Sequence, residues 1–508
     1  MFQELTEKLK DCPVIFRWVS LFVFVGLVSP TVINYTPYPL AWDESYYLHR
    51  IICMNRAVYD LNWSRVTECL AGMHKAPIVG LINLPWGRAG GTDWGIGLAF
   101  VGLALFIWIM VLATYLTCMR GGIPPTSLLL GAASIYLTPF LRLTGGDMMT
   151  DMLLAWCITL ALMLIPLEYN DPQTTLWPSV LRGLLWGFVI DVGMLSKLTF
   201  AFFFGTIGVA LLGIRWWRSG MRPLFCALGG CVVGAIPAAM VWSIYGGNFL
   251  RFAVMVAWGD VSRLWDVPGM TAGGYIYRYF SDLNVALIPL VLLLILFVRG
   301  LSIEKKGRLV RLVPIGTLLV YLMIAARSQN RDPRFTIPVM IALPLGLAWT
   351  KSKRASEMVM GVTPVLAALI AGMLFAIPMV AKPEITPIEH SGELLRNLSR
   401  GRPVAAIIAT DGPQFNIETF QVARQIGGEY LRPVRVDTLV YDEVNKRTLE
   451  DGLRRIDKAD YVLFLKPEHT PGPDWSRTRA KDYRAYCENK GRLMDVQTSP
   501  DFDVFKIH

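Results

Sequence analysis

Residues 14–34 read VIFRWVSLFVFVGLVSPTVIN, and residues 42–47 read WDESYY. The first segment is an apolar run long enough to cross the roughly 30 Å of bilayer hydrocarbon as one helix. The second segment places Asp43 beside Glu44 shortly after that crossing. Ionisable groups at the edge of a bilayer are costly, and by default they mark a functional site. The pattern therefore indicates a membrane protein with an acidic site next to its first helix.

The remaining sequence is typical of a polytopic membrane protein. Of its 508 residues, 54% are hydrophobic and 17% are charged, against about 25% charged residues in soluble proteins. The first apolar run is too long for the core of a signal peptide and no cleavage site follows it, so we expect it to be retained. Eleven runs are predicted to cross the membrane: residues 14–34, 94–118, 123–141, 152–167, 177–196, 198–214, 224–245, 284–298, 309–326, 335–350 and 359–380.

The distribution of charge predicts the orientation. The formal net charge of +10 comes from residues 1–380, because the basic and acidic residues of 381–508 are equal in number. Much of the excess lies in three short loops that follow even-numbered runs, at residues 215–222, 299–311 and 351–354. The positive-inside rule places these loops and the N-terminus in the cytoplasm. No basic face interleaved with aromatic residues predicts a nucleic-acid partner.

Three segments on the predicted outer side are longer than ordinary loops. Residues 35–93 contain two patterns of interfacial helices, at 44–59 and 63–70, and residues 246–283 are rich in aromatic residues and glycine. Residues 1–380 are thus expected to form a transmembrane module, with these two segments as its outer loops. The eleven crossings place the third segment, residues 381–508, outside the cytoplasm.

Residues 381–508 alternate apolar strands with helical patterns, which predicts a small α/β domain. The predicted strands are 404–410, 434–440, 461–465, 492–496 and 503–507, and the predicted helices are 416–426, 446–456 and 477–489. No G-x-G-x-x-G motif follows the first strand, so a nucleotide site is not predicted. The expected fold class is a polytopic α-helical membrane protein of about eleven helices with a C-terminal extracytoplasmic α/β domain.

Two of the eight cysteines, Cys53 and Cys69, lie in the first outer segment. An oxidising compartment would allow a disulfide between them, and two buried free thiols are the alternative. The eight cysteines show no C-x-x-C and no zinc spacing.

Several ionisable residues are predicted to gather on the outer face. They are Asp43, Glu44, His74, Lys75, Asp147, Asp151, Lys197, Arg327, Arg331 and Arg334. Lys and Arg at the headgroup level can bind a lipid phosphate and stabilise the charge that develops as it leaves. A carboxylate at the water boundary can accept a proton from an attacking hydroxyl. These residue types together predict group transfer from a lipid phosphate.

The motifs that carry these residues resemble those of the GT-C type integral-membrane glycosyltransferases. The resemblance is greatest to the dolichyl-phosphate-mannose protein mannosyltransferases and the bacterial lipid A aminoarabinose transferases, over roughly residues 10–350. The matching motifs are Trp42-Asp43-Glu44-Ser45-Tyr46-Tyr47, Lys75-Ala76-Pro77, Asp151 at the start of the fourth run, Gly193 to Lys197, and Arg334-Phe335-Thr336-Ile337-Pro338. The sequence departs from the family at Ala76, where a proline is usual, and at Phe335, where a tyrosine is common.

The resemblance implies roles for individual residues. Asp43 would be the base or would orient the acceptor, with Glu44 in support and Asp151 completing the acidic site. The donor phosphate would be bound by Lys75, Lys197, Arg331 and Arg334. Further candidates are Asp147, which competes with Asp151 for its role, His74, Tyr46 and Tyr47.

Each role has a structural alternative. Asp43 and Asp151 are favoured N-caps for the helices that follow them, and Lys75 would also fit as a residue that extends to the interface. Asp332 has the charge and the position to pair with one of the neighbouring arginines. Asp191 lies inside the fifth apolar run, and the sequence identifies no partner for it.

The resulting hypothesis is an inverting glycosyltransferase of the bacterial inner membrane. It would transfer a sugar from a polyprenyl-phosphate donor to a glycan, lipid or protein acceptor at the outer face, among membrane lipids. No cofactor is identified, and a divalent metal ion is left open. The alternatives are a transporter or flippase for lipid-linked substrates and, more weakly, a non-catalytic scaffold. Transporters place ionisable groups near the bilayer midplane in repeated halves, whereas these groups lie at one rim and no repeat is visible.

Overall fold

The computed structural model describes most of the chain in two compact units. These units comprise residues 1–35, 70–79 and 102–380, and residues 36–69, 80–101 and 381–508. The described residues are 13–32, 42–71, 77–83, 93–144, 150–258, 270–303, 307–328, 332–350, 386–412, 414–426, 431, 433–442, 447–467, 469, 478–494 and 501–508. Within these ranges, the side chains of a few helical segments, including residues 42–45, are outside the description.

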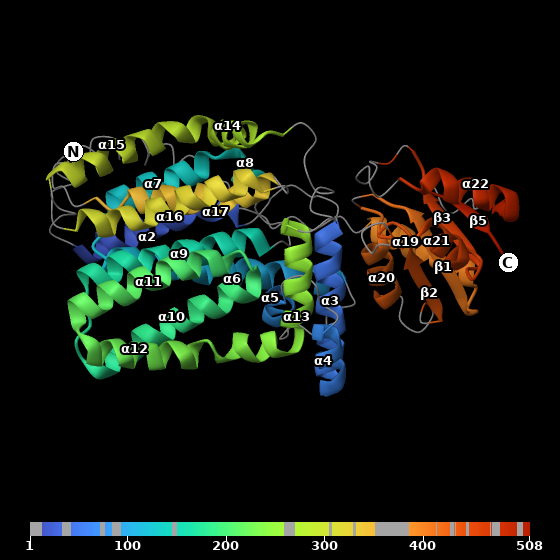
Figure 1. The fold of residues 1–508 in the computed structure, drawn as a ribbon, viewed down its shortest axis with the longest axis horizontal. Coiled ribbons are helices and arrows are strands. Elements are labelled where there is room, and N and C mark those ends of the chain that lie inside the picture. The colour runs from blue at the N-terminus through green and yellow to red at the C-terminus, as the bar shows by residue number, and fades with distance from the viewer. Residues whose placement is uncertain are drawn as a thin grey trace. The chain divides into compact units, whose positions relative to one another are not determined.

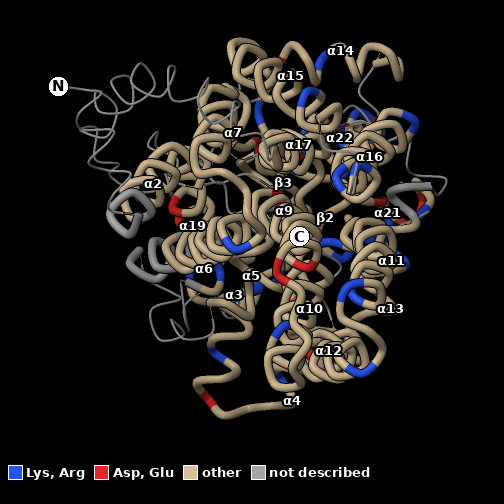
Figure 2. Tube along the Cα trace, turned by 90° about the vertical axis from the view of Figure 1, so that its left-hand side faces the viewer, with Lys and Arg blue, Asp and Glu red and all other residues tan. Residues whose placement is uncertain are grey.

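The first unit is a bundle of apolar helices (Figure 1), along which charged residues are sparse (Figure 2). Its helices are α2 (Pro13–Val28), α6 (Asp93–Arg120), α7 (Pro125–Leu137), α8 (Pro139–Thr144), α9 (Thr150–Asn170), α10 (Leu176–Ser196), α11 (Phe200–Ser219), α12 (Met221–Gly234), α13 (Ile236–Trp258), α14 (Ala272–Leu283), α15 (Leu287–Ile303), α16 (Arg308–Arg327) and α17 (Ile337–Leu347). Short 3-10 turns are η1 (Ser29–Thr31), η4 (Asn284–Ala286) and η5 (Pro333–Thr336).

Among the described residues, six helices are long and apolar enough to cross a membrane, or seven if the bent pair α12–α13 forms one crossing. Together with three shorter apolar helices, they occupy ten of the eleven predicted runs. The run at 359–380 lies outside the described residues, so the count of eleven remains a prediction. The segment 246–283, which the sequence suggested as a loop, contains the end of α13 and all of α14.

Helix α9 is the centre of the bundle. Its whole crossing is buried, and α10, α11, α16 and α17 pack against it. A helix that is apolar on every side is expected in such a position. Its two acidic residues, Asp151 and Glu168, lie near opposite ends, about 26 Å apart along the axis at a rise of 1.5 Å per residue.

Helices α10 and α12 approach closely because glycines face each other across their contact. A Cβ atom on Gly183 would collide with the backbone of Ala227, and one on Gly187 would collide with that of Cys231. From the other side, a Cβ on Gly230 would collide with the backbone of Val180. Small residues at a spacing of four allow this close packing of membrane helices.

Asp191, for which the sequence offered no partner, has one in the structure. Its carboxylate on α10 accepts a hydrogen bond from the backbone N–H of Ala238. Ala238 lies in the first turn of α13, just after the 47° bend that separates α13 from α12. The first N–H groups of a helix have no partner within it, so Asp191 caps α13 from the neighbouring helix.

The second unit contains the C-terminal α/β domain. Its elements are α19 (Thr386–Ser399), β1 (Val404–Thr410), α20 (Ile417–Ile426), β2 (Val434–Thr438), α21 (Leu449–Ile456), β3 (Tyr461–Leu465), α22 (Ala480–Lys490), β4 (Arg492–Met494) and β5 (Phe502–Lys506). The strand order is β2-β1-β3-β5-β4. Strands β2, β1 and β3 are parallel, whereas β5 and β4 are antiparallel to their neighbours.

The two faces of this sheet have separate cores. Along β1, Ala406 and Ile408 pack with residues of α19 and α20, while Ile407 and Ala409 pack with residues of α21 and α22. This alternation follows from the two-residue period of a strand. Both faces are covered, as expected for a sheet with parallel strands at its centre.

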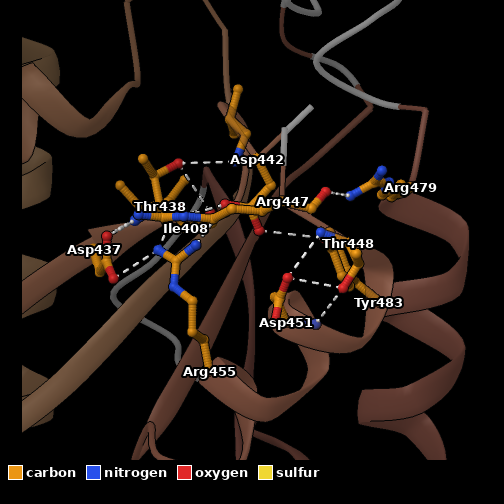
Figure 3. A network of polar contacts seen from close by, with 11 residues as sticks. Ile408, Asp437, Thr438, Asp442, Arg447, Thr448, Asp451, Arg455, Arg479 and Tyr483 are labelled. Atoms are coloured by element: carbon orange, nitrogen blue, oxygen red, sulfur yellow. Dashed lines mark hydrogen bonds and ion pairs between the residues drawn. The ribbon is translucent and has the colours of Figure 1, made fainter. Parts of the chain in front are cut away.

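A polar network links the end of β2 to the helix that follows it (Figure 3). The buried carboxylate of Asp442 accepts a hydrogen bond from Arg455 at 2.5 Å and one from Arg447 at 3.3 Å. Arg455 also donates to the Thr438 carbonyl at 2.7 Å. The network therefore holds the connection between β2 and α21 in place.

The second unit also includes α3 (Trp42–Tyr59) and most of α4 (Trp63–Ala71) and α5 (Ile78–Ile82), all from the predicted first outer segment, and residues 93–101 at the start of α6. The first two confirm the predicted helices at 44–59 and 63–70. Cys53 on α3 and Cys69 on α4 form a disulfide with a Cα–Cα distance of 6.1 Å, which decides between the two alternatives.

Candidate functional site

The centre of the candidate site is an ion pair between Asp151 and Lys197. Asp151 lies in the first turn of α9 and is buried. Its carboxylate accepts a hydrogen bond from the ammonium group of Lys197, which follows the last residue of α10. The pair therefore joins two neighbouring helices at one end of the bundle.

The Gly193-to-Lys197 motif has a local structural reason. Lys197 is extended, and its N–H donates to the Gly193 carbonyl at 3.1 Å while its carbonyl accepts from the N–H of Phe200 at 3.0 Å. A Cβ atom on Gly193 would collide with the Phe200 ring. Glycine at this position thus lets α11 turn back tightly after α10, which leaves Lys197 at the turn.

The late Arg-Phe motif supplies the second part of the site. The guanidinium of Arg334, in η5, donates to Asp332 Oδ2 from Nε at 2.9 Å and from Nη2 at 2.6 Å. The next residue, Phe335, has its ring centroid 5.3 Å from the Lys197 ammonium nitrogen, a distance at which a cation is attracted to a ring face. Lys197 thus lies between Asp151 and the late motif.

The Asp332 carboxylate interacts electrostatically with both Arg334 and Lys197. Its burial raises the pKa, but the Arg334 guanidinium, hydrogen bonds from Arg334 and the Lys197 charge outweigh burial and hold the pKa of this carboxyl below its usual value. Nearby positive charge favours the ionised form of a carboxyl group. Asp151, Lys197, Asp332 and Arg334 therefore form one cluster of alternating charge. The expected pairing of Asp332 with an adjacent arginine is confirmed.

Two tyrosines border this cluster. The Tyr275 hydroxyl of α14 donates to the Asp332 carbonyl at 3.2 Å. Tyr321 of α16 lies within electrostatic range of Asp151 and Tyr275, and its ring is 4.6 Å from that of Phe203. The sequence did not single out Tyr321, because an aromatic residue in an apolar run is most simply read as a packing residue.

An apolar groove begins close to Lys197. It is formed by α9, α10, α11 and α12, and its lining includes Trp186, Phe200, Leu212 and Cys231. Phe200 lies three residues after Lys197, and the lining on α11 continues to Leu212, about 18 Å further along the axis. The groove has a volume of about 80 Å³, and its lining is apolar.

Six of the remaining predicted residues lie partly or wholly outside the description. Asp43 and Glu44 lie in the first turn of α3, with their side chains outside the described part of the structure. His74, Lys75, Asp147 and Arg331 lie wholly outside the described residues.

Tyr46 and Tyr47 are buried within α3, with ring centroids 5.8 Å apart. The Arg50 guanidinium lies 5.2 Å from the centroid of the Tyr46 ring. Among the residues that the structure describes, no group of three or more His, Cys, Asp or Glu could hold a metal ion.

A second polar cluster lies at the other end of α9 and was missed by the sequence analysis. Glu168 and Arg215, both fully buried, form an ion pair at 2.6 Å. Arg215 also donates to the Ser179 hydroxyl at 2.6 Å, and Arg182 donates to Glu168 at 3.3 Å. Charge counting assigned Arg215 to a basic loop, whereas its side chain joins α9, α10 and α11.

Comparisons with known proteins identify the fold. No protein-family model matches the chain, and no curated protein matches its sequence. The crystal structure of ArnT from Cupriavidus metallidurans bound to undecaprenyl phosphate matches with a TM-score of 0.54 and 12% identity, over 98% of this chain and 98% of that chain. Apo ArnT matches with a TM-score of 0.57 and 12% identity, over 99% and 98%. ArnT is a lipid A aminoarabinose transferase, and the chain therefore has the fold of the GT-C integral-membrane glycosyltransferases.

Proposed function

We propose that this protein transfers a sugar from a polyprenyl-phosphate donor to an acceptor hydroxyl at the membrane surface. The observation that carries the proposal is the cluster of Asp151, Lys197, Asp332 and Arg334 at one end of the bundle, next to an apolar groove. Binding of undecaprenyl phosphate by ArnT, which shares the fold, supports the choice of a lipid phosphate as the donor group.

The cations suit a phosphate that becomes a leaving group. The Lys197 ammonium has three N–H donors and the Arg334 guanidinium has five. Asp151 and Asp332 hold these two groups through one or two of those donors. An anchored cation is already oriented when the substrate arrives, so its field is available as charge develops on the phosphate. The proposed donor phosphate therefore lies between Lys197 and Arg334.

The groove suits the lipid part of the donor. A polyprenyl chain is apolar, and apolar side chains such as Phe204 and Leu211 line the groove, whose volume of about 80 Å³ matches a short part of such a chain. Because the groove begins three residues beyond Lys197, a phosphate at that residue would leave the chain pointing along α11. The same arrangement would serve the released polyprenyl phosphate.

The proposed reaction is a direct displacement. The acceptor oxygen forms a bond to the anomeric carbon of the sugar while the bond from that carbon to the phosphate oxygen breaks, and the configuration inverts. The electron pair of the broken bond remains on the phosphate, where Lys197 and Arg334 stabilise it. The acceptor hydroxyl loses its proton to a carboxylate, for which the sequence motif favours Asp43.

The direct test is release of polyprenyl phosphate, a product that does not depend on which sugar or acceptor is used. The purified full-length protein in lipid nanodiscs is incubated with synthetic polyprenyl-phosphate sugars and an envelope extract, with and without EDTA, and lipids are analysed by mass spectrometry. The substitution Asp43→Asn should abolish release. The matched control, Asp60→Asn, removes an exposed carboxylate just after the same helix and should not.

Three outcomes would contradict parts of the proposal. Full activity of Asp43→Asn would remove Asp43 as the base. Absence of released polyprenyl phosphate with every donor would contradict the glycosyltransferase. Movement of an intact lipid-linked donor across a proteoliposome membrane, with no transfer product, would favour the flippase.

A further inference from the structure

Helix α3, which begins at Trp42, packs along α20 of the C-terminal domain. Two polar contacts join them. His49 Nδ1 and Glu418 Oε2 are 2.8 Å apart, and the Arg56 guanidinium donates to the backbone carbonyl of Gln425. The contacts connect segments that are 369 residues apart in the sequence, so they belong to the tertiary fold rather than to local chain geometry.

The spacing of these contacts fixes the relation of the two helices. His49 and Arg56 are seven residues apart, and so are Glu418 and Gln425. Seven residues make two helical turns, about 10.5 Å. Because the earlier residue of α3 contacts the earlier residue of α20, the two helices run parallel and in register over this length.

The contact is shielded from solvent. The side chains of His49 and Glu418 are 16% and 20% exposed. Ile52 and Val422, which lie between the two polar contacts on their respective helices, are fully buried. A partly buried polar contact is screened less than a surface ion pair, and breaking it leaves a group without its partner.

Other contacts hold the remaining sides of α3. The disulfide from Cys53 to Cys69 joins α3 to α4. On α5, a Cβ atom on Gly80 would lie 2.7 Å from Met54 Sδ, so that helix approaches closely as well. The first turn of α3 carries Asp43 and Glu44, only six residues before His49. A shift of α3 along α20 would therefore move the acidic motif with it.

We propose that α20 positions the acidic motif, with Glu418 acting through His49 and the Gln425 carbonyl through Arg56. None of these four residues is assigned a contact with the reacting atoms. The proposal rests on the proposed function, because it assigns the base to α3. Each residue is a positioning residue whose loss lowers turnover rather than donor binding.

The test compares Glu418→Ala, His49→Ala and the exchanged pair His49→Glu with Glu418→His in the full-length protein. Hydrogen exchange of residues 46–59 measures how firmly α3 is held, and exchange of β1 shows that the domain remains folded. We expect Glu418→Ala to speed exchange in α3 and to lower kcat by about tenfold, the effect of losing one charged hydrogen bond. The KM for the lipid-linked donor should change by less than about twofold, since α3 is assigned no contact with the donor phosphate.

The exchanged pair should restore both kcat and the protection of α3. The matched control is Glu393→Ala, which removes an exposed carboxylate from α19 of the same domain and should change neither quantity. A Glu418→Ala protein with faster exchange in α3 and unchanged kcat overturns the positioning role. Unchanged hydrogen exchange of residues 46–59 in Glu418→Ala would show that the contact with α20 does not hold α3 in place. A wild-type protein that transfers no sugar contradicts the proposed function and the catalytic part of this inference, while the exchange data still decide whether α20 holds α3.

Discussion

Asp151 and Lys197 are 46 residues apart in the sequence, and their side chains form an ion pair where α9 and α10 reach the same end of the bundle. Asp151 is buried, whereas the side chain of Lys197 is 28% exposed. The carboxylate thus lies behind the ammonium group, and the partly exposed cation is the member of the pair that a substrate can reach. This order favours a role for Lys197 in binding and a role for Asp151 in holding it.

Lys197→Met should lower the rate of polyprenyl-phosphate release by about 10²–10³, the cost of removing one preorganised donor from a developing anion. Lys197→Arg should retain more activity, because it keeps the charge but changes its geometry. The rates are measured under single-turnover conditions. Arg222→Met, which removes an exposed cation at the start of α12, is the control. A wild-type rate of polyprenyl-phosphate release in Lys197→Met would contradict the assignment of Lys197 to the phosphate site.

The low pKa of Asp332 predicts that the folded protein loses stability at acidic pH. Its folded-state pKa lies below the ordinary value because of Arg334 and Lys197, despite its burial. Such a group contributes stability above its unfolded pKa of about 4 and loses it as the pH falls through the lower folded value. The Tm of wild type should therefore exceed that of Asp332→Asn at pH 6, and the difference should shrink below about pH 4. Equal melting of the two proteins at every pH would contradict the pairing.

The raised pKa of Asp411 predicts the opposite effect in the C-terminal domain, a loss of stability as the pH rises. Burial raises the pKa of this carboxyl to about 7. A carboxyl group with a raised folded pKa stabilises the fold below its unfolded pKa of about 4, and this stability is lost as the pH rises through about 7. Wild type should thus be less stable at pH 8 than at pH 5, whereas Asp411→Asn should show little change.

The Asp411 prediction can be measured in the intact protein through a thiol. Cys487 is a free cysteine that is fully buried in the core of the same domain. The temperature at which a maleimide labels Cys487, read by peptide mass spectrometry, reports unfolding of this domain alone. Wild type and Asp411→Asn are compared at each pH, so the intrinsic reactivity of the thiol cancels. An equal shift in both proteins would assign the pH dependence to another group.

Two glycine substitutions should have opposite effects. Gly183→Ala places a Cβ against the backbone of Ala227 and forces α10 away from α12, at a cost of about 1–3 kcal/mol. Gly213→Ala on α11 meets no atom within 4 Å and should stabilise its helix by about 0.5–1 kcal/mol. Thermal unfolding in one detergent compares them. A neutral Gly183→Ala would mean that the two helices do not pack this closely.

Glu168→Gln tests the buried cluster at the other end of α9. It leaves the guanidinium of Arg215, which is fully buried, without a charged partner. Breaking a buried ion pair from one side costs about 3–5 kcal/mol, so we expect a lower Tm and poor yield. Asp171→Asn, which alters a carboxylate that is 42% exposed and pairs with Arg182, is the control and should have a small effect. Normal stability of Glu168→Gln would show that Arg215 is satisfied by other groups.

The sequence was most informative where the pattern is local. Strands β1 and β3 have the predicted bounds, 404–410 and 461–465, because each is a short β-branched and apolar run between polar turns. The turn at Lys197 was also found, since an isolated basic residue interrupts two apolar runs. The predicted run at 123–141 is instead divided between α7 and α8, because Pro139 begins a new helix.

The sequence was least informative where distant residues meet. The pairing of Arg215 with Glu168 depends on how α9 and α11 pack, which the charge of a loop does not reveal. The partner of Asp191 is a backbone N–H of another helix, and no residue type marks it. The contact of His49 with Glu418 joins residues from two distant parts of the sequence, and no local pattern marks it.

The contact between α3 and α20 can form only late in protein synthesis. A ribosome that adds about 5–20 residues per second needs roughly 20–70 s to travel the 369 residues from His49 to Glu418. For most of that interval α3 has left the ribosome, while α20 has not yet been synthesised. A chain that is released early therefore lacks α20. Its α3 then has no contact with α20, although α3 itself is fully synthesised.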